Sequence, residues 1–367
     1  MMQHTPLDVS QLSPAAQRAL GPGPGRAMAA RGLLPLPPAD QVAVLYQLSI
    51  DTESNIAQSA RASAAGMPEK LLAGTLAAPQ NDPRVLDFFA GLIADKPAVF
   101  DAIALNPSVS DATIATLAGR AGSREVDQIA QNEQRLLRHP EIIAAMYMNR
   151  RARMSTIDRV VELAVRNNVR VPGLAAWDEV ARALTGAAPA STEDDAVFAA
   201  VAAEQQDDSA LITGDPEQPL SEAELAAEAA AAAAANDDRD LTIPMKIRLA
   251  TLGNAVERGK LIRDPVRIVA MAAIKSPGVS DIEAARYAGN QALAEDVIRY
   301  IAANRNWTKL YGVKVSLCRN PKSPISETAR FLPFLRQKDL VNLSKSKGVP
   351  SAVNAQARKL ISQRGGK

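Results

Sequence analysis

Apolar residues recur with the spacing of short helices over most of the chain. Val42, Leu45 and Leu48 lie three residues apart, as on one face of an α-helix, and Val297 and Ile301 lie four apart near the other end. Each apolar run is short and closes at proline, glycine or asparagine, which commonly end helices. No stretch combines strict apolar–polar alternation with the β-branched residues of a strand. The pattern therefore predicts an all-α protein.

Changes in composition divide the chain into four parts. Residues 1–39 are punctuated throughout by proline and glycine and predict a flexible arm. Helical periodicity then predicts a helical-repeat block over residues 40–186. Residues 187–240 are acidic and alanine-rich, which predicts a largely disordered linker. A second helical-repeat block is expected over residues 241–367.

Two stretches of the chain match each other at an offset of 170 to 172 residues. The matched pairs include Pro107 with Pro277, Ser110 with Ser280, Asp111 with Asp281, Asn149 with Asn320, and Ser155 with Ser326. Asn106 to Asn149 spans 43 residues and Ser276 to Asn320 spans 44, the length of a HEAT- or armadillo-type unit. One such unit cannot bury its apolar face alone, so neighbouring units must stack. We therefore expect an α-solenoid in two blocks, joined by the acidic linker.

Two dipeptides suggest where repeat helices begin. Ser276-Pro277 and Asn320-Pro321 place an N-cap residue before a proline, and proline is tolerated at the first helical position. We expect a helix to start at each of them.

The repeat pattern resembles known families of short helical repeats. The segments VRIVAMAAIKSP, VIRYIAANRNW and VKVSLCRNPKSP are similar to the HEAT, armadillo and leucine-rich-variant classes, and resemble a group of uncharacterised bacterial helical-repeat proteins. The resemblance covers residues 245–362 better than residues 40–180. Leucine-rich-variant proteins can carry an iron–sulfur cluster on a cysteine-rich segment. This chain has one cysteine, so the resemblance implies a fold and no cofactor.

Composition agrees with a helical protein and excludes several kinds of cysteine-based site. Alanine, the best helix former, supplies much of the 47% apolar content, and aromatic residues are only 4%. The single cysteine, Cys318, excludes an intrachain disulfide framework and cysteine-based zinc or iron–sulfur sites. It also agrees with a reducing, cytoplasmic location. We see no signal peptide and no apolar run long enough to cross a bilayer.

Charge is strongly segregated along the chain. The formal net charge of +2 divides into zero over residues 1–186, −13 over residues 187–240 and +15 over residues 241–367. The last part holds 23 Lys and Arg against 8 Asp and Glu, so most of its cations cannot pair within it. Such a surface is typical of proteins that bind a polyanion or an acidic protein.

Basic residues of the last part fall near expected helix ends, where a solenoid would align them along one edge. The candidate binding residues are Lys275, Arg299, Arg305, Lys309, Lys314, Arg319, Lys322, Arg336, Lys338, Lys345 and Lys347. The aromatics Tyr287, Tyr300, Trp307, Tyr311 and Phe331 are interleaved with them. We interpret these as core residues, with base stacking as the alternative.

No motif predicts catalysis, a metal or a cofactor. The stretch GNAVERGK, Gly253 to Lys260, resembles a phosphate-binding loop but has five residues between its glycines and Leu261 in place of Ser or Thr. We interpret it as a junction between helices. Cys318 lies on a mostly apolar helix and predicts an inert buried thiol.

Three functions remain open from the sequence. The leading hypothesis is a non-enzymatic interaction scaffold whose basic block engages an acidic protein surface or another polyanion, with the acidic linker folding back to mask it. The alternative is a nucleic-acid-binding HEAT-like repeat protein, recognised by steep salt dependence. An enzyme acting on damaged bases would need a carboxylate in a basic cleft, and the candidates are Asp281, Glu283 and Glu327. The sequence does not predict the oligomeric state.

Overall fold

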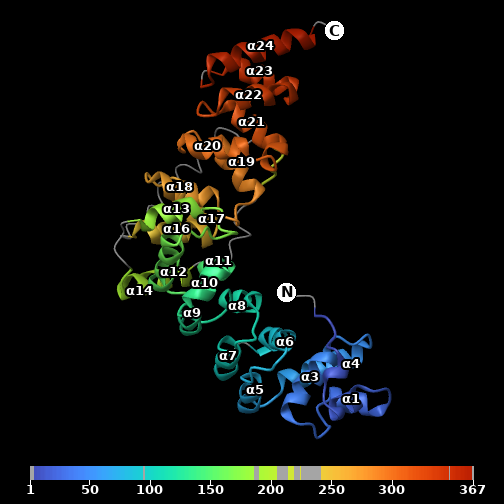
Figure 1. Cartoon of the computed structure of the whole chain (residues 1–367). Coiled ribbons are helices and arrows are strands. Elements are labelled where there is room, and N and C mark those ends of the chain that lie inside the picture. Colours follow the sequence, from blue (N-terminus) through green and yellow to red (C-terminus); the bar gives the residue numbers. More distant parts are fainter. Residues whose placement is uncertain are drawn as a thin grey trace. The chain divides into compact units, whose positions relative to one another are not determined.

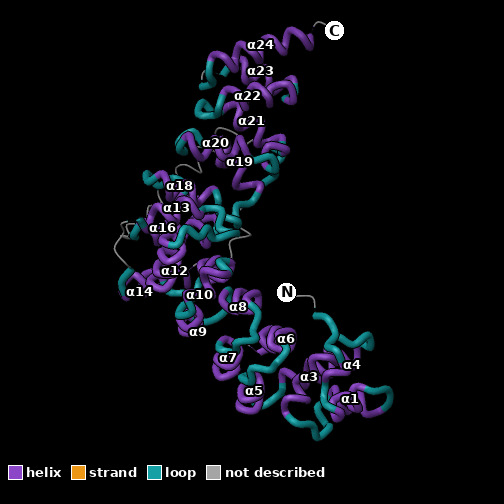
Figure 2. Tube along the Cα trace, viewed as in Figure 1, coloured by secondary structure: helices purple, strands orange, loops and turns teal. Residues whose placement is uncertain are grey.

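The chain consists of short helices joined by short loops. The computed structural model describes residues 4–93, 96–185, 190–204, 214–218, 224, 241–346 and 348–365, and no strand occurs among them (Figure 2). The all-α prediction is confirmed over this part of the chain. Contacts divide the chain into two compact units, Met1–Gly173 and Leu174–Lys367.

In the first unit, most helices pack against helices close to them in the chain. Its elements are η1 (Val9–Gln11), α1 (Pro14–Leu20), α2 (Pro24–Ala30), α3 (Pro38–Ser49), α4 (Ser54–Ala65), α5 (Glu69–Leu76), α6 (Pro83–Ile93), α7 (Pro97–Ala104), α8 (Asp111–Ala118), α9 (Ser123–Ile129), α10 (Glu133–Arg138), α11 (Glu141–Met148) and α12 (Met154–Arg166) (Figure 1).

The structure corrects the prediction of a flexible arm over residues 1–39. Residues 14–30 form α1 and α2, which pack against α3. Both helices begin with proline, which lacks only an N–H that the first turn leaves unpaired in any case. Ser13 caps α1 by accepting from the Ala16 N–H, and its hydroxyl donates to Asp40 Oδ2 at 2.6 Å. Proline at a helix start therefore accounts for the apparent loop composition.

The second unit contains the described parts of the acidic segment and the whole basic block. Its elements are α13 (Trp177–Leu184), α14 (Thr192–Glu204), α16 (Ile243–Leu252), α17 (Ala255–Leu261), α18 (Arg267–Ile274), α19 (Asp281–Gly289), α20 (Glu295–Ala303), η2 (Trp307–Lys309), α21 (Tyr311–Arg319), α22 (Ile325–Phe331), η3 (Leu332–Phe334), α23 (Gln337–Lys345) and α24 (Ser351–Gly365). Helix α14 lies within residues 187–240, expected to be a largely disordered linker; most of that segment lies outside the described residues. None of the described helices is long and apolar enough to span a membrane.

Apolar stripes bury each helix against its neighbours. In α20, Val297, Ile298 and Ile301 are fully buried, as their spacing predicts. Buried alanines such as Ala284 and Ala288 let α19 approach α21 closely. Small aliphatic side chains thus supply the close contact between these two helices.

Buried asparagines join the end of one helix to the end of another about 30 residues earlier. Asn149 Nδ2 donates to the carbonyls of Ala118 and Ala121, each at 2.8 Å. Asn320 Nδ2 donates to the carbonyls of Ala288 at 2.9 Å and Asn290 at 3.2 Å. The last carbonyls of a helix have no partner within it, and these amides bind those of Ala118 in α8 and Ala288 in α19.

This role corrects the prediction that Ser276-Pro277 and Asn320-Pro321 start helices. Asn320 is instead the C-cap of α21, and Ser276 follows α18 and donates its hydroxyl to the Thr251 carbonyl at 2.9 Å. The next helices begin several residues later, with Ser280 as the N-cap of α19. Both side chains donate hydrogen bonds to carbonyls at the end of an earlier helix, and local sequence does not reveal such a partner.

Residues matched by the internal duplication make the same contacts in both units. Ser110 is the N-cap of α8 and Ser280 is the N-cap of α19. Ser155 and Ser326 are each the second residue of their helices, α12 and α22. Together with the two asparagine contacts, these equivalences indicate that the match reflects a repeated structural unit.

Candidate interaction surface of the basic block

The predicted basic residues lie on several elements of the second unit. Ten of the eleven belong to the described residues, and Lys347 lies outside them. Lys275 is largely buried, and both oxygens of Glu179 accept from its ammonium group at 2.9 Å. Arg299 pairs with Glu295, and Arg319 lies 3.5 Å from Asp339. These three residues are therefore neutralised by neighbouring carboxylates.

The carboxylates of the basic block are almost all used in such pairs. Seven of its eight acidic side chains lie within 4 Å of a cation of the same block: Glu257 with Lys260, Asp264 with Lys246, Glu283 with Arg258, Glu295 with Arg299, Asp296 with Arg267, Glu327 with Arg330, and Asp339 with Arg319. The remaining cations have almost no acidic side chain left within the block.

Seven predicted residues accordingly lack a carboxylate partner within the part of the chain that the structure describes: Arg305, Lys309, Lys314, Lys322, Arg336, Lys338 and Lys345. Lys322 donates to the Leu293 carbonyl at 2.6 Å and Lys314 to the Lys309 carbonyl at 2.9 Å. A carbonyl orients an ammonium group without cancelling its charge. The surface thus keeps an uncompensated positive charge.

Aromatic rings lie under some of these cations. The Arg336 guanidinium is 4.5 Å from the centre of the Tyr311 ring, and Lys314 is 5.7 Å from the centre of the Phe334 ring. Phe334 is 69% exposed, which is unusual for a large apolar side chain. Burial and then a hydrogen bond to Asp339 raise the pKa of Tyr311, so its hydroxyl stays a donor to that carboxylate. We name Lys309, Tyr311, Lys314, Phe334 and Arg336 the α21 corner.

Most of the other interleaved aromatics are core residues, as expected. Tyr287, Trp307 and Phe331 are buried. Tyr300 is half-buried and lines a groove of about 300 Å³ formed by α13, α18 and α20. Arg182 also lines this groove, although it lies outside the predicted basic residues.

A short turn of the acidic segment lies on the N-terminus of α21. The Glu217 Oε2 atom accepts from the Tyr311 N–H at 2.8 Å, across 94 residues of sequence. A Cβ atom on Gly312 would lie 2.4 Å from the Pro216 carbonyl oxygen and 2.9 Å from that of Gln218. Only glycine at position 312 allows the turn to approach so closely. Masking by the acidic segment was expected in general, but neither Glu217 nor Gly312 was among the expected residues. The available signal was the Asp-Pro-Glu turn within that segment.

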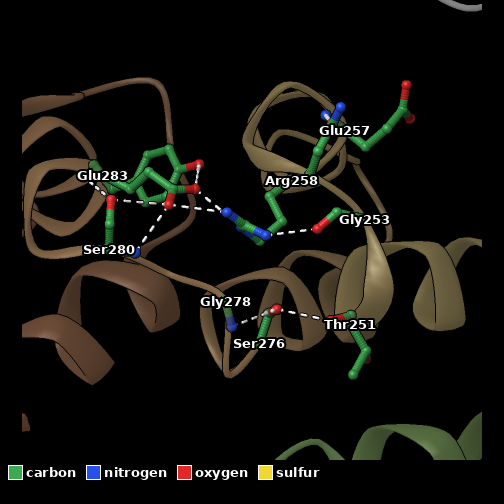
Figure 3. Close-up of polar contacts among 10 residues, drawn as sticks. Thr251, Gly253, Glu257, Arg258, Ser276, Gly278, Ser280 and Glu283 are labelled. Atoms are coloured by element: carbon green, nitrogen blue, oxygen red, sulfur yellow. Dashed lines mark hydrogen bonds and ion pairs between the residues drawn. The ribbon is translucent and has the colours of Figure 1, made fainter. Parts of the chain in front are cut away.

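One of the three carboxylate candidates for an enzyme, Glu283, is engaged within the fold. Both Arg258 Nε and Arg258 Nη2 donate to Glu283 at 2.9 Å, and Arg258 Nη1 donates to the Gly253 carbonyl at 2.6 Å (Figure 3). Glu283 also accepts from the Ser280 N–H and hydroxyl, completing a capping box. Both side chains are more than 90% buried. The carboxylate therefore joins α17 to α19 rather than facing a cleft.

The remaining enzyme candidates are surface residues. Asp281 is exposed in the first turn of α19, and Glu327 pairs with Arg330 three residues along α22. Within the described residues, no three His, Cys, Asp or Glu side chains are arranged to hold a metal ion.

Two sequence interpretations are confirmed locally. Gly253 is the C-cap of α16 and Asn254 the N-cap of α17, so the GNAVERGK stretch is a junction between helices. Cys318 is fully buried, and this burial raises the pKa of its thiol to about 12.

Comparisons with protein-family models, curated proteins and solved structures found no match to this chain.

Proposed function

We propose that the protein is a non-enzymatic interaction scaffold, built as an α-solenoid of HEAT-like repeats, whose basic block binds an acidic protein surface or another polyanion. The proposal rests on one observation: almost every carboxylate of the block already forms an ion pair within the block. Seven of eight are paired within it, while seven predicted cations have no carboxylate partner among the described residues.

Such a surface attracts anions over a distance comparable with the Debye length, about 8 Å at physiological salt. It also has aromatic faces at the α21 corner that can contact the partner once it arrives. Acidic protein segments and nucleic acids both satisfy the charge. The acidic protein is favoured because a carboxylate, that of Glu217, already lies on the α21 N-terminus.

The test is fluorescence anisotropy with the full chain and three labelled probes: polyglutamate, random duplex DNA and random single-stranded RNA. The informative variant reverses three exposed cations of the block, as Arg305→Glu, Lys338→Glu and Lys345→Glu. The matched control makes the same charge change in the first unit, as Arg31→Glu, Arg61→Glu and Lys70→Glu; all six residues are exposed.

We expect polyglutamate binding that the first triple variant weakens about tenfold or more, equivalent to about 1.4 kcal/mol, while the control triple changes it little. Tighter binding of DNA or RNA than of polyglutamate would replace the acidic protein with a nucleic acid as the partner. Equal losses in both triple variants would contradict the assignment of binding to the basic block.

A further inference from the structure

The N-terminus of α21 is capped by a residue that lies far away in the sequence. The N-cap residue Leu310 has no side chain able to accept a hydrogen bond, so the first N–H groups of α21 need another acceptor. Glu217 provides it for Tyr311 at 2.8 Å. A carboxylate at this end of a helix is also favoured by the helix dipole.

The turn that carries Glu217 has a defined shape of its own. Asp215 Oδ1 accepts from the Glu217 N–H at 2.9 Å, and the Asp215 carbonyl accepts from the Gln218 N–H at 3.0 Å. Gly214 has a φ of 155°, a region that other residues rarely adopt. The segment thus presents a preformed acidic turn rather than a loose chain.

The receiving surface is shaped to that turn. Gly312 leaves room for the backbone carbonyls of Pro216 and Gln218, and Ile282 of α19 lies against Gly214. Lys314 directs its ammonium group to the Lys309 carbonyl, just before the first turn of α21. A helix N-terminus without a side-chain cap of its own and a glycine that leaves room for the turn therefore occur together at the start of α21.

We propose that the N-terminus of α21 is a docking site for an acidic peptide turn, and that the chain's own Asp215–Gln218 turn fills it as an internal competitor. An external partner with a similar turn binds after displacing the internal one. This inference rests on the proposed function, since it names the partner chemistry and the regulation of the same basic surface.

The effect of the internal turn on the apparent affinity for an external peptide can be calculated from its occupancy. If the internal turn occupies the site about 90% of the time, the apparent affinity for an external peptide falls about tenfold. Removing the internal carboxylate should therefore raise the apparent affinity about tenfold, although it adds no contact to the partner.

The experiment measures binding of a labelled peptide with the sequence of residues 210–220 to three full-length chains. These are the wild type, Glu217→Ala, and the control Glu193→Ala, which removes an exposed carboxylate of the acidic segment in α14. We expect Glu217→Ala to bind the peptide about tenfold more tightly than the wild type, and Glu193→Ala to match the wild type. Equal affinity of all three chains would overturn the proposal.

A second variant separates docking from general charge effects. Gly312→Ala suits the second position of a helix but places a methyl group where the turn's carbonyls lie. Combined with Glu217→Ala, it should abolish the gain in peptide affinity that Glu217→Ala gives alone. Retention of the gain would refute the α21 site even if polyglutamate binds, whereas loss of polyglutamate binding by the wild type would refute the proposed function itself.

Discussion

The buried pair of Arg258 and Glu283 gives the clearest energetic prediction. Glu283 accepts five hydrogen bonds: two from Arg258, two from Ser280, and one from the Tyr287 hydroxyl at 3.3 Å. Glu283→Gln keeps the size of the side chain but leaves the Arg258 charge buried without a counterion. Breaking a buried pair in this way costs about 3–5 kcal/mol.

Tryptophan fluorescence in a urea titration measures this loss selectively, because Trp177 and Trp307 both lie in the second unit. With an m-value of about 2 kcal/mol per molar urea, the midpoint should fall by roughly 1.5–2.5 M. The matched control is Glu327→Gln, which removes the same charge from an exposed pair with Arg330 and should cost about 0–1 kcal/mol.

A double variant tests the reasoning further. Arg258→Met with Glu283→Leu removes both charges, and it should recover much of the stability lost in Glu283→Gln because no unpaired buried charge remains. The account would be refuted if Glu283→Gln shifted the midpoint no more than Glu327→Gln does.

Three further predictions concern the fold. Asn320→Ala leaves two helix-end carbonyls without their donor and should lower the free energy of unfolding by about 2 kcal/mol, whereas Asn306→Ala on the exposed surface should change it little; urea titration compares them. Cys318 should resist alkylation in the folded chain at pH 8 and react rapidly in urea, as mass spectrometry would show; fast labelling of the folded chain would contradict its burial. A hydrogen bond from Arg138 lowers the pKa of Asp111, so this pair should stabilise the chain above about pH 4 and lose that effect as the pH falls below it. Circular dichroism of Asp111→Asn should show a stability deficit at pH 6 that narrows at pH 3; an equal deficit at both values would argue against the pair.

The helical character was predictable because it depends on local pattern. Apolar spacing of three and four residues identified the stripe of α20, and the duplication aligned Ser110 with Ser280, which proved to be equivalent N-caps. Segments that begin with proline were less predictable. Residues 14–30 look like a loop in composition but are helices, since proline at the first position costs no hydrogen bond.

The site was predictable only in its charge. Counting residues gave the excess of cations, but pairing depends on contacts between distant residues, such as Lys275 with Glu179 across 96 positions. The contact of Glu217 with Tyr311 is equally non-local. Glu283 combines both kinds of contact, because its capping box with Ser280 is local while its partner Arg258 comes from another helix.

The proposed function requires that the uncompensated cations of the basic block bind an anionic partner. Its most direct test is the salt dependence of polyglutamate affinity for the full chain, compared between the wild type and the Arg305→Glu, Lys338→Glu, Lys345→Glu variant. We expect the affinity to fall steeply with salt in the wild type and with a shallower slope in the variant, because the variant releases fewer counterions on binding. Absence of binding at low salt, or identical slopes for the two chains, would contradict it.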